Sequence, residues 1–298
     1  MSGSALPGPL GVLVTPGAAP RTGFVARALR HRSFAVGALL SLLLLVAALV
    51  SLGWSPYPPA EIDIPHKLQA PSAAHWFGTD SLGRDIASQL LVGAQASIMV
   101  GVFAVLIGFT IGTALGLLAS ARGGWVEEGV MRLADFAFAF PALLSAIMLG
   151  AIYRPGLVTG IVAIGIFNIP VFARVTRASA NAIWSREYVL AARAAGKNRW
   201  QTTWDHVLPN IASVLIVQAT NQFATAIIAE AALSYLGLGT QPPMPSWGRM
   251  LNEAQTQIFQ APMLAVYPGV AIVLAVLGLN LMGDGLRDLL DPKLARKR

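Results

Sequence analysis

The chain has 298 residues, of which 55% are hydrophobic and only 12% are charged. A soluble domain is usually about one quarter charged, so this composition excludes an ordinary soluble fold. Because the apolar residues come in long blocks, the chain is expected to be an integral membrane protein. The absence of cysteine excludes disulfides and thiolate metal sites. Basic loops flanking the membrane explain the net charge of +7 better than nucleic-acid binding does.

Six apolar blocks are long enough to cross a bilayer, since a hydrocarbon core of ~30 Å needs about 20 helical residues. They predict an all-α integral membrane fold with six transmembrane helices. The predicted spans are Phe34–Gly53, Leu90–Ala119, Val130–Tyr153, Leu157–Val175, Ile211–Leu236 and Met263–Met282.

Lysine and arginine set the expected orientation, because the cytoplasmic loops of membrane proteins carry an excess of them. With six spans and the N-terminus inside, 17 of the 21 Lys and Arg fall in cytoplasmic segments or at inner helix ends. Both termini are therefore expected in the cytoplasm. The expected segments are a partly disordered tail at 1–33, a first span at 34–53, an external segment at 54–89, a five-helix core at 90–286 with a cytoplasmic loop at 176–210, and a basic tail at 287–298.

The second predicted span carries three glycines at four-residue spacing, Gly108, Gly112 and Gly116. This spacing places them on one helix face, where the missing side chains let a neighbouring backbone come close. We interpret the pattern as helix packing. A moving contact between helices is the alternative.

The fifth predicted span is the most polar. Gln218, Asn221, Gln222 and Thr225 fall at i, i+3, i+4 and i+7, so they form one stripe along the helix. Lipid cannot satisfy amide groups, and the stripe must therefore face protein or water. Two interpretations stay open: hydrogen bonds between helices, or the wall of a polar pathway.

Charged residues near the ends of the predicted spans are expected to have structural roles. Asp135 lies one turn from Arg132, which favours a local ion pair. Glu230 lies near the external end of its span and off the amide stripe, so we expect it to bond to the backbone of a loop.

The loop at 176–210 is polar and basic, and it lies between two very apolar spans. Helix propensity predicts one helix from Thr176 to Ala195, stopped by Gly196, and a second that Asn198 caps. Pro209 is expected to limit the second helix where the chain re-enters the membrane. Trp200, Trp204, Val207 and Leu208 repeat at i, i+4, i+7 and i+8 and form one apolar face, which is expected to pack on the bundle or on a partner.

This loop resembles the EAA loop of bacterial ABC importer permeases, in which EAA is followed by three residues, Gly, nine residues and Ile-x-Leu-Pro. Ala191, Ala192, Gly196, Leu208 and Pro209 match that pattern at its spacing. Two positions depart from it. Leu190 stands where the motif has Glu, with Glu187 one turn earlier, and His206 stands where it has Ile.

Three further segments look like the C-type permease subunit of dipeptide and oligopeptide importers. They are Phe77–Gly101, Ala229–Leu251 and Asn280–Leu294. The resemblance implies a type I ABC importer permease fold in the bacterial cytoplasmic membrane. It implies as partners a homologous B-type permease subunit, two ATPase subunits docked on the EAA loops, and an extracytoplasmic substrate-binding protein.

The same resemblance implies a non-catalytic subunit that binds no cofactor of its own, with ATP and Mg²⁺ on the ATPase partners. The sequence agrees, since no G-x-x-x-x-G-K-[ST] phosphate-binding loop is present. A permease for nickel or glutathione would share these segments. An ion-coupled carrier would instead be expected to show inverted repeats and buried ionisable residues, neither of which is evident.

Overall fold

The computed structural model describes residue 28 and residues 31–290, whose regular structure is helical with no β-strand, so the all-α prediction is confirmed for this part of the chain. The predicted N-terminal tail lies almost entirely outside the described residues. The long helical elements, in chain order, are α2 (Arg32–Val50), α3 (Ile86–Ile107), α4 (Thr113–Arg122), α5 (Gly124–Ala139), α6 (Ala142–Tyr153), α7 (Leu157–Trp184), α10 (Leu208–Tyr235) and α12 (Met263–Leu290). The short helices are α8 (Glu187–Ala194), α9 (Arg199–Thr202) and α11 (Trp247–Ala254).

Five helical stretches are long and apolar enough to cross a membrane, and the pair α5–α6 makes a sixth if it is taken as one span. Two of the five contain a π-helical turn. Residues Gly108–Gly112 join α3 to α4, and residues Thr203–Val207 join α9 to α10, so each stretch is continuous over 37 residues.

The third predicted span is not one helix. Its two halves, α5 and α6, meet at 82°. The break falls at Phe140–Pro141, where Phe140 has an extended backbone with φ −94° and ψ 129°. Proline lacks the amide donor and disfavours helical geometry in the residue before it, which explains a bend that hydropathy alone cannot reveal.

Several other predicted boundaries move as well. Helix α3 begins at Ile86 rather than at residue 90, because the Asp85 side chain caps it by accepting a hydrogen bond from the Ser88 amide at 2.8 Å. Helix α7 continues nine residues past Val175 to Trp184. Helix α12 extends to Leu290, so residues 287–290 are helical and not part of the predicted tail, the rest of which lies outside the described residues.

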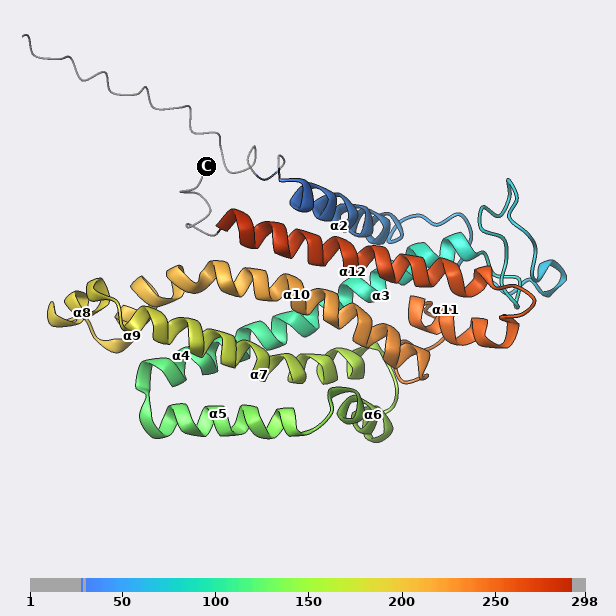
Figure 1. Ribbon diagram of the computed structural model, residues 1–298. Coiled ribbons are helices and arrows are strands. Elements are labelled where there is room, and N and C mark those ends of the chain that lie inside the picture. Colours follow the sequence, from blue (N-terminus) through green and yellow to red (C-terminus); the bar gives the residue numbers. More distant parts are fainter. Residues whose placement is uncertain (1–27, 29–30, 291–298) are drawn as a thin grey trace, which may run out of the picture.

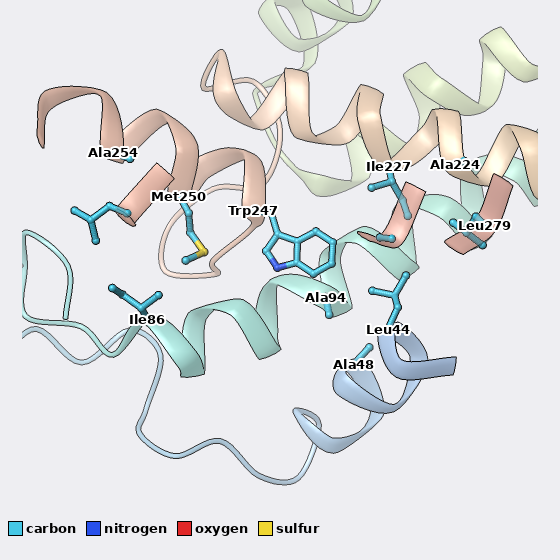
Figure 2. Close-up of a cluster of buried hydrophobic side chains, with 12 residues drawn as sticks. Leu44, Ala48, Ile86, Ala94, Ala224, Ile227, Trp247, Met250, Ala254 and Leu279 are labelled. Atoms are coloured by element: carbon cyan, nitrogen blue, oxygen red, sulfur yellow. The ribbon is translucent and has the colours of Figure 1, made fainter. Parts of the chain in front are cut away.

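Most of the long helices lie roughly along one axis, whereas α6 is seen nearly end-on; α2 and α12 lie side by side, and α7 lies between α5 and α10 (Figure 1). One hydrophobic cluster joins α2, α3, α10, α11 and α12 (Figure 2). Trp247 of α11 lies at its centre, 4% exposed, and its indole N–H donates to the Leu90 carbonyl at 2.9 Å. The cluster therefore fixes the short helix α11 against the long apolar helices.

The three glycines of the second span all face α7. A Cβ at Gly108 would meet Asn168, one at Gly112 would meet the Ile169 carbonyl, and one at Gly116 would lie 2.6 Å from the Ala173 carbonyl oxygen. The backbones of α4 and α7 are therefore in direct contact, which fixes the C-terminal half of α7 and the loop that follows it.

Replacing Gly116 with alanine is expected to destabilise the protein by roughly 1–3 kcal/mol, because the new methyl group would overlap a backbone oxygen that cannot move freely. The control is Gly129→Ala in α5, where nothing lies within 4 Å of the added Cβ. This control is expected to be neutral or slightly stabilising, since alanine is favoured over glycine in helices. Thermal unfolding of both purified variants in detergent provides the comparison, and equal midpoints would contradict the close α4–α7 contact.

Candidate functional site

The loop at 176–210 folds as a helix–turn–helix whose second helix continues into the apolar helix α10. The prediction of one helix from Thr176 to Ala195 is wrong, because α7 ends at Trp184 and α8 is a separate helix. The chain breaks at Arg186, whose ψ of 142° is extended. Val189 is fully buried and anchors α8, while Tyr188 and Leu190 stay about half exposed.

Gly196 makes the turn between the two helices. Its φ is +93°, a left-handed conformation that side chains other than glycine adopt at a cost, and nothing lies within 4 Å of the position that a Cβ would take. The amide of Lys197 donates to the Ala192 carbonyl at 3.2 Å, a bond that closes the end of α8. The expected cap of the second helix is present: Asn198 Oδ1 accepts from the Gln201 amide at 2.9 Å, and Gln201 Oε1 accepts from the Asn198 amide at 3.0 Å.

Pro209 does not end a helix, contrary to the expectation from sequence. The helical stretch from Arg199 continues through it to Tyr235. The preceding π-helical turn changes the hydrogen-bond pattern, so that the Leu208 amide donates five residues back to Thr203. In addition, Asn210 Nδ2 donates to the His206 carbonyl at 2.6 Å. These hydrogen bonds let the helix continue although Pro209 has no amide donor, and the sequence alone did not predict them.

The predicted loop residues differ in exposure. Glu187, Ala191, Gly196 and Pro209 are exposed, while Ala192 and Leu208 are half-buried. Val207 is fully buried against α4 and α7. Trp200 and Trp204 are 47% and 62% exposed, and the rest of each indole lines a groove beside α4. Of the predicted apolar face, Val207 therefore packs inside the protein, whereas Trp200 and Trp204 remain partly exposed.

The amide stripe of α10 is partly covered by α12. Gln218, Asn221 and Gln222 are half-buried and Thr225 is exposed. Asn221 lies against α12, since its Oδ1 is 3.0 Å from the position that a Cβ at Gly283 would take. Within the part of the chain that the structure describes, the three amide side chains make no hydrogen bond to a neighbouring helix; the Thr225 hydroxyl donates to the Asn221 carbonyl of its own helix at 3.0 Å.

Two ion pairs join α5 to α7 on the cytoplasmic side. Asp135 pairs with Arg174 across the helices, so the expected local pair with Arg132 is wrong; Arg132 instead pairs with Glu128 at 3.4 Å. Arg174 also stands over the Phe138 ring, 4.2 Å from its centroid. The second pair joins Arg177 to Glu127.

Glu230 is 3% exposed and holds the start of the external loop. Its carboxylate accepts from Ser234 Oγ at 2.6 Å and from Thr240 Oγ1 at 3.2 Å. The partners are hydroxyl groups and not the loop backbone that the sequence led us to expect.

A polar cluster between the start of α3 and α11 was not predicted, because its members are far apart in the sequence. Arg84, 7% exposed, donates to Asp80 at 2.6 Å and pairs with Glu253 of α11, 169 residues away. Burial acts to lower the pKa of Arg84, but the carboxylates of Asp80 and Glu253 outweigh it and raise that pKa above its usual value. Among the described residues, no group of three or more His, Asp or Glu could hold a metal ion.

Residues 104–296 match the family model described as the binding-protein-dependent transport system inner membrane component. The chain belongs to this family. It is thus a permease subunit of an ABC importer, a multi-pass membrane component that acts with a partner permease, ATPases and a substrate-binding protein.

Relatives of this permease match along most of its length. It is 44% identical over 276 residues to the glutathione transport system permease protein GsiD of Pectobacterium atrosepticum, covering 92% of each chain. It is 46% identical over 235 residues to the dipeptide transport system permease protein DppC of Alkalihalophilus pseudofirmus, covering 79% of this chain and 77% of the relative. A GsiD protein of Escherichia coli O157:H7 is 45% identical, covering 90% of this chain and 89% of the relative.

A solved structure has a similar fold. A chain of the inward-facing MetNI methionine ABC transporter aligns with a TM-score of 0.56 over 68% of the permease and 97% of that chain. The sequences are 20% identical, so this likeness concerns the fold alone.

Replacing Arg84 of the permease with methionine is expected to cost roughly 3–5 kcal/mol, because it leaves two carboxylates without their shared cation in a largely buried site. The control is Arg132→Met, which removes an exposed i,i+4 pair with Glu128 and is expected to cost at most ~0.5 kcal/mol. Thermal unfolding of each variant in detergent measures the difference. Similar losses in both would show that the external cluster is not stabilising.

Proposed function

We propose that this permease is one half of the transmembrane path of an ATP-driven importer of short peptides. The names of its relatives carry the proposal: one is a dipeptide permease and the others are glutathione permeases. Glutathione is itself a tripeptide, so the named cargoes share peptide bonds and charged ends. Dipeptides and oligopeptides are the leading substrate class, and glutathione is the second candidate.

Substrate choice can be tested in cells that express the permease with its partner subunits. Uptake of a radiolabelled dipeptide is expected, with competition by other dipeptides at lower concentrations than by glutathione. Stronger competition by glutathione would make glutathione the leading substrate and dipeptides the second candidate. Absence of peptide uptake from a fully assembled complex would refute the proposal.

The amide stripe of α10 is the proposed wall of the path. Gln218, Asn221, Gln222 and Thr225 lie along one side of the helix, where Asn221 is next to Gly283 of α12, and the three amide side chains have no hydrogen-bond partner on neighbouring helices in the described chain. Exposure of such groups to lipid would be costly. Amides both donate and accept hydrogen bonds, as peptide groups do, so the stripe suits a peptide that moves past it.

Replacing Gln222 with leucine is expected to lower uptake about 2–10-fold, the effect of one lost hydrogen bond of ~0.5–1.5 kcal/mol. The control is Ile228→Leu, a conservative change of an exposed apolar residue on the same helix. Uptake is measured beside pull-down of the partner subunits. If assembly is lost instead of transport, the stripe is a packing surface between subunits.

The helix pair α8–α9 is the proposed contact with an ATPase subunit, in the orientation with both termini in the cytoplasm. The proposed surface comprises α8 with Glu187, Ala191 and Ala192, the Gly196 turn, the exposed edges of Trp200 and Trp204, and the start of α10 at Leu208 and Pro209. Its exposed apolar side chains, Tyr188 and Leu190, support a role in docking, since such groups favour burial at an interface. ATP and Mg²⁺ would bind to the ATPase partners, and a homologous B-type permease would complete the path.

Replacing Gly196 with valine is expected to uncouple ATP hydrolysis from uptake. A β-branched residue at φ +93° is strained by at least ~1–2 kcal/mol, enough to shift the turn. Gly196→Asn is the matched control, because asparagine tolerates left-handed geometry and is expected to keep most of the coupling. Uptake and ATPase rates of the reconstituted complex are compared, with ATPase pull-down alongside. Normal uptake in the valine variant would contradict a coupling role for this turn.

A further inference from the structure

A groove of about 570 Å³ lies where α4 meets the cytoplasmic start of the α10 stretch. Its lining includes Phe109, Thr113, Leu117 and Leu118 on one side and Trp200 and Trp204 on the other. The lining is almost entirely apolar, and neither the family nor the relatives assign it a ligand. The groove is separate from the amide stripe of α10. The part of α10 that carries the stripe faces α12, since a Cβ added at Gly283 would meet Thr220 and Asn221.

Two arginines lie near the cytoplasmic end of the groove without lining it: Arg199 precedes Trp200 in the chain, and Arg122 follows Leu118 by one helical turn. Arg199 donates from Nη1 to the carbonyls of Ala121 and Arg122, both at 2.9 Å, which holds it at the end of α4. Arg122 is exposed and has no ion-pair partner among the described residues. This end of the groove is therefore positively charged, while the interior is apolar.

The depth of the groove matches one leaflet of a bilayer. From Leu118 to Phe109 the lining helix spans nine residues, about 14 Å at ~1.5 Å per residue. Half of a hydrocarbon core is about 15 Å. Tryptophan is enriched at the membrane–water boundary, and basic pockets between helices on the cytoplasmic side bind anionic lipid headgroups.

We propose that this groove binds one anionic phospholipid of the inner leaflet. An acyl chain occupies the space between α4 and the two indoles, and the phosphate lies beside Arg122. The bound lipid would then join the end of α4 to the helix that leads from the Gly196 turn into the membrane.

The test measures lipid retention by native mass spectrometry of the full-length permease in its assembled complex. Dioleoyl phosphatidylglycerol and dioleoyl phosphatidylcholine are added separately, so that the acyl chains are the same and only the headgroup differs. Wild-type protein is expected to retain phosphatidylglycerol at least about 5-fold better. Equal retention of the two lipids would overturn the proposal.

Two variants with matched controls locate the site. Ala114→Phe, which fills the groove, is expected to reduce bound phosphatidylglycerol about 5-fold or more, whereas Val102→Phe, at an exposed position on the same helical stretch outside the groove, is not. Arg122→Gln is expected to remove most of the headgroup preference, whereas Arg132→Gln, at an exposed position on α5, is expected to leave it. Equal effects within either pair would refute the site.

Two further measurements cover the remaining outcomes. Quenching of tryptophan fluorescence in the unaltered chain by phosphatidylglycerol with brominated acyl chains is expected to exceed quenching by brominated phosphatidylcholine, and it does not depend on whether a variant folds. Ala114→Cys gives a single thiol in a chain without cysteine. Efficient cross-linking of that thiol to the partner permease would assign the groove to a subunit contact and reject the lipid.

Discussion

The direct contact between the backbones of α4 and α7 organises the end of the permease that carries the α8–α9 loop. Gly112 and Gly116 allow it, and any side chain there would overlap the opposite backbone or its neighbours. Three neighbouring elements depend on its position. Helix α5 is tied to α7 by two ion pairs, α8 follows from the end of α7, and Arg199 attaches the second loop helix to the end of α4. In a membrane, where helices gain little from hydrophobic burial against each other, such close packing is a main source of association.

The sequence was sufficient for properties that depend on composition and local chemistry. Hydropathy located five spans and the region of the sixth, and the glycine at 196 and the Asn198 cap have the local geometry that their residue types favour. It was insufficient where competing local signals had to be weighed. Pro141 breaks a span, whereas Pro209 is accommodated by a π-helical turn.

Side-chain partners distant along the chain were the least predictable. Asp135 has an arginine one turn away, yet it pairs with Arg174, 39 residues later, because α5 lies against α7. Arg84 and Glu253 meet only after α11 has packed on α3. The exposure of the amide stripe likewise depends on which sides of α10 are covered by α3, α7 and α12, and helical periodicity defines the stripe without indicating what it faces.

The unbroken helical stretch from Arg199 to Tyr235 has a mechanical consequence. A tilt at one end of a continuous helix displaces each point in proportion to its distance from that end, and the two ends here are the Gly196 turn and the loop held by Glu230. Trp200 and Gln218 are 18 residues apart, or about 27 Å at ~1.5 Å per residue. A tilt of about 10° of the whole helix about the end near the Gly196 turn would displace Gln218 sideways by roughly 5 Å over that length, comparable to the width of an extended peptide strand. In the proposed orientation, the helix thus has the geometry of a lever arm whose short movements beside the Gly196 turn become larger ones within the membrane.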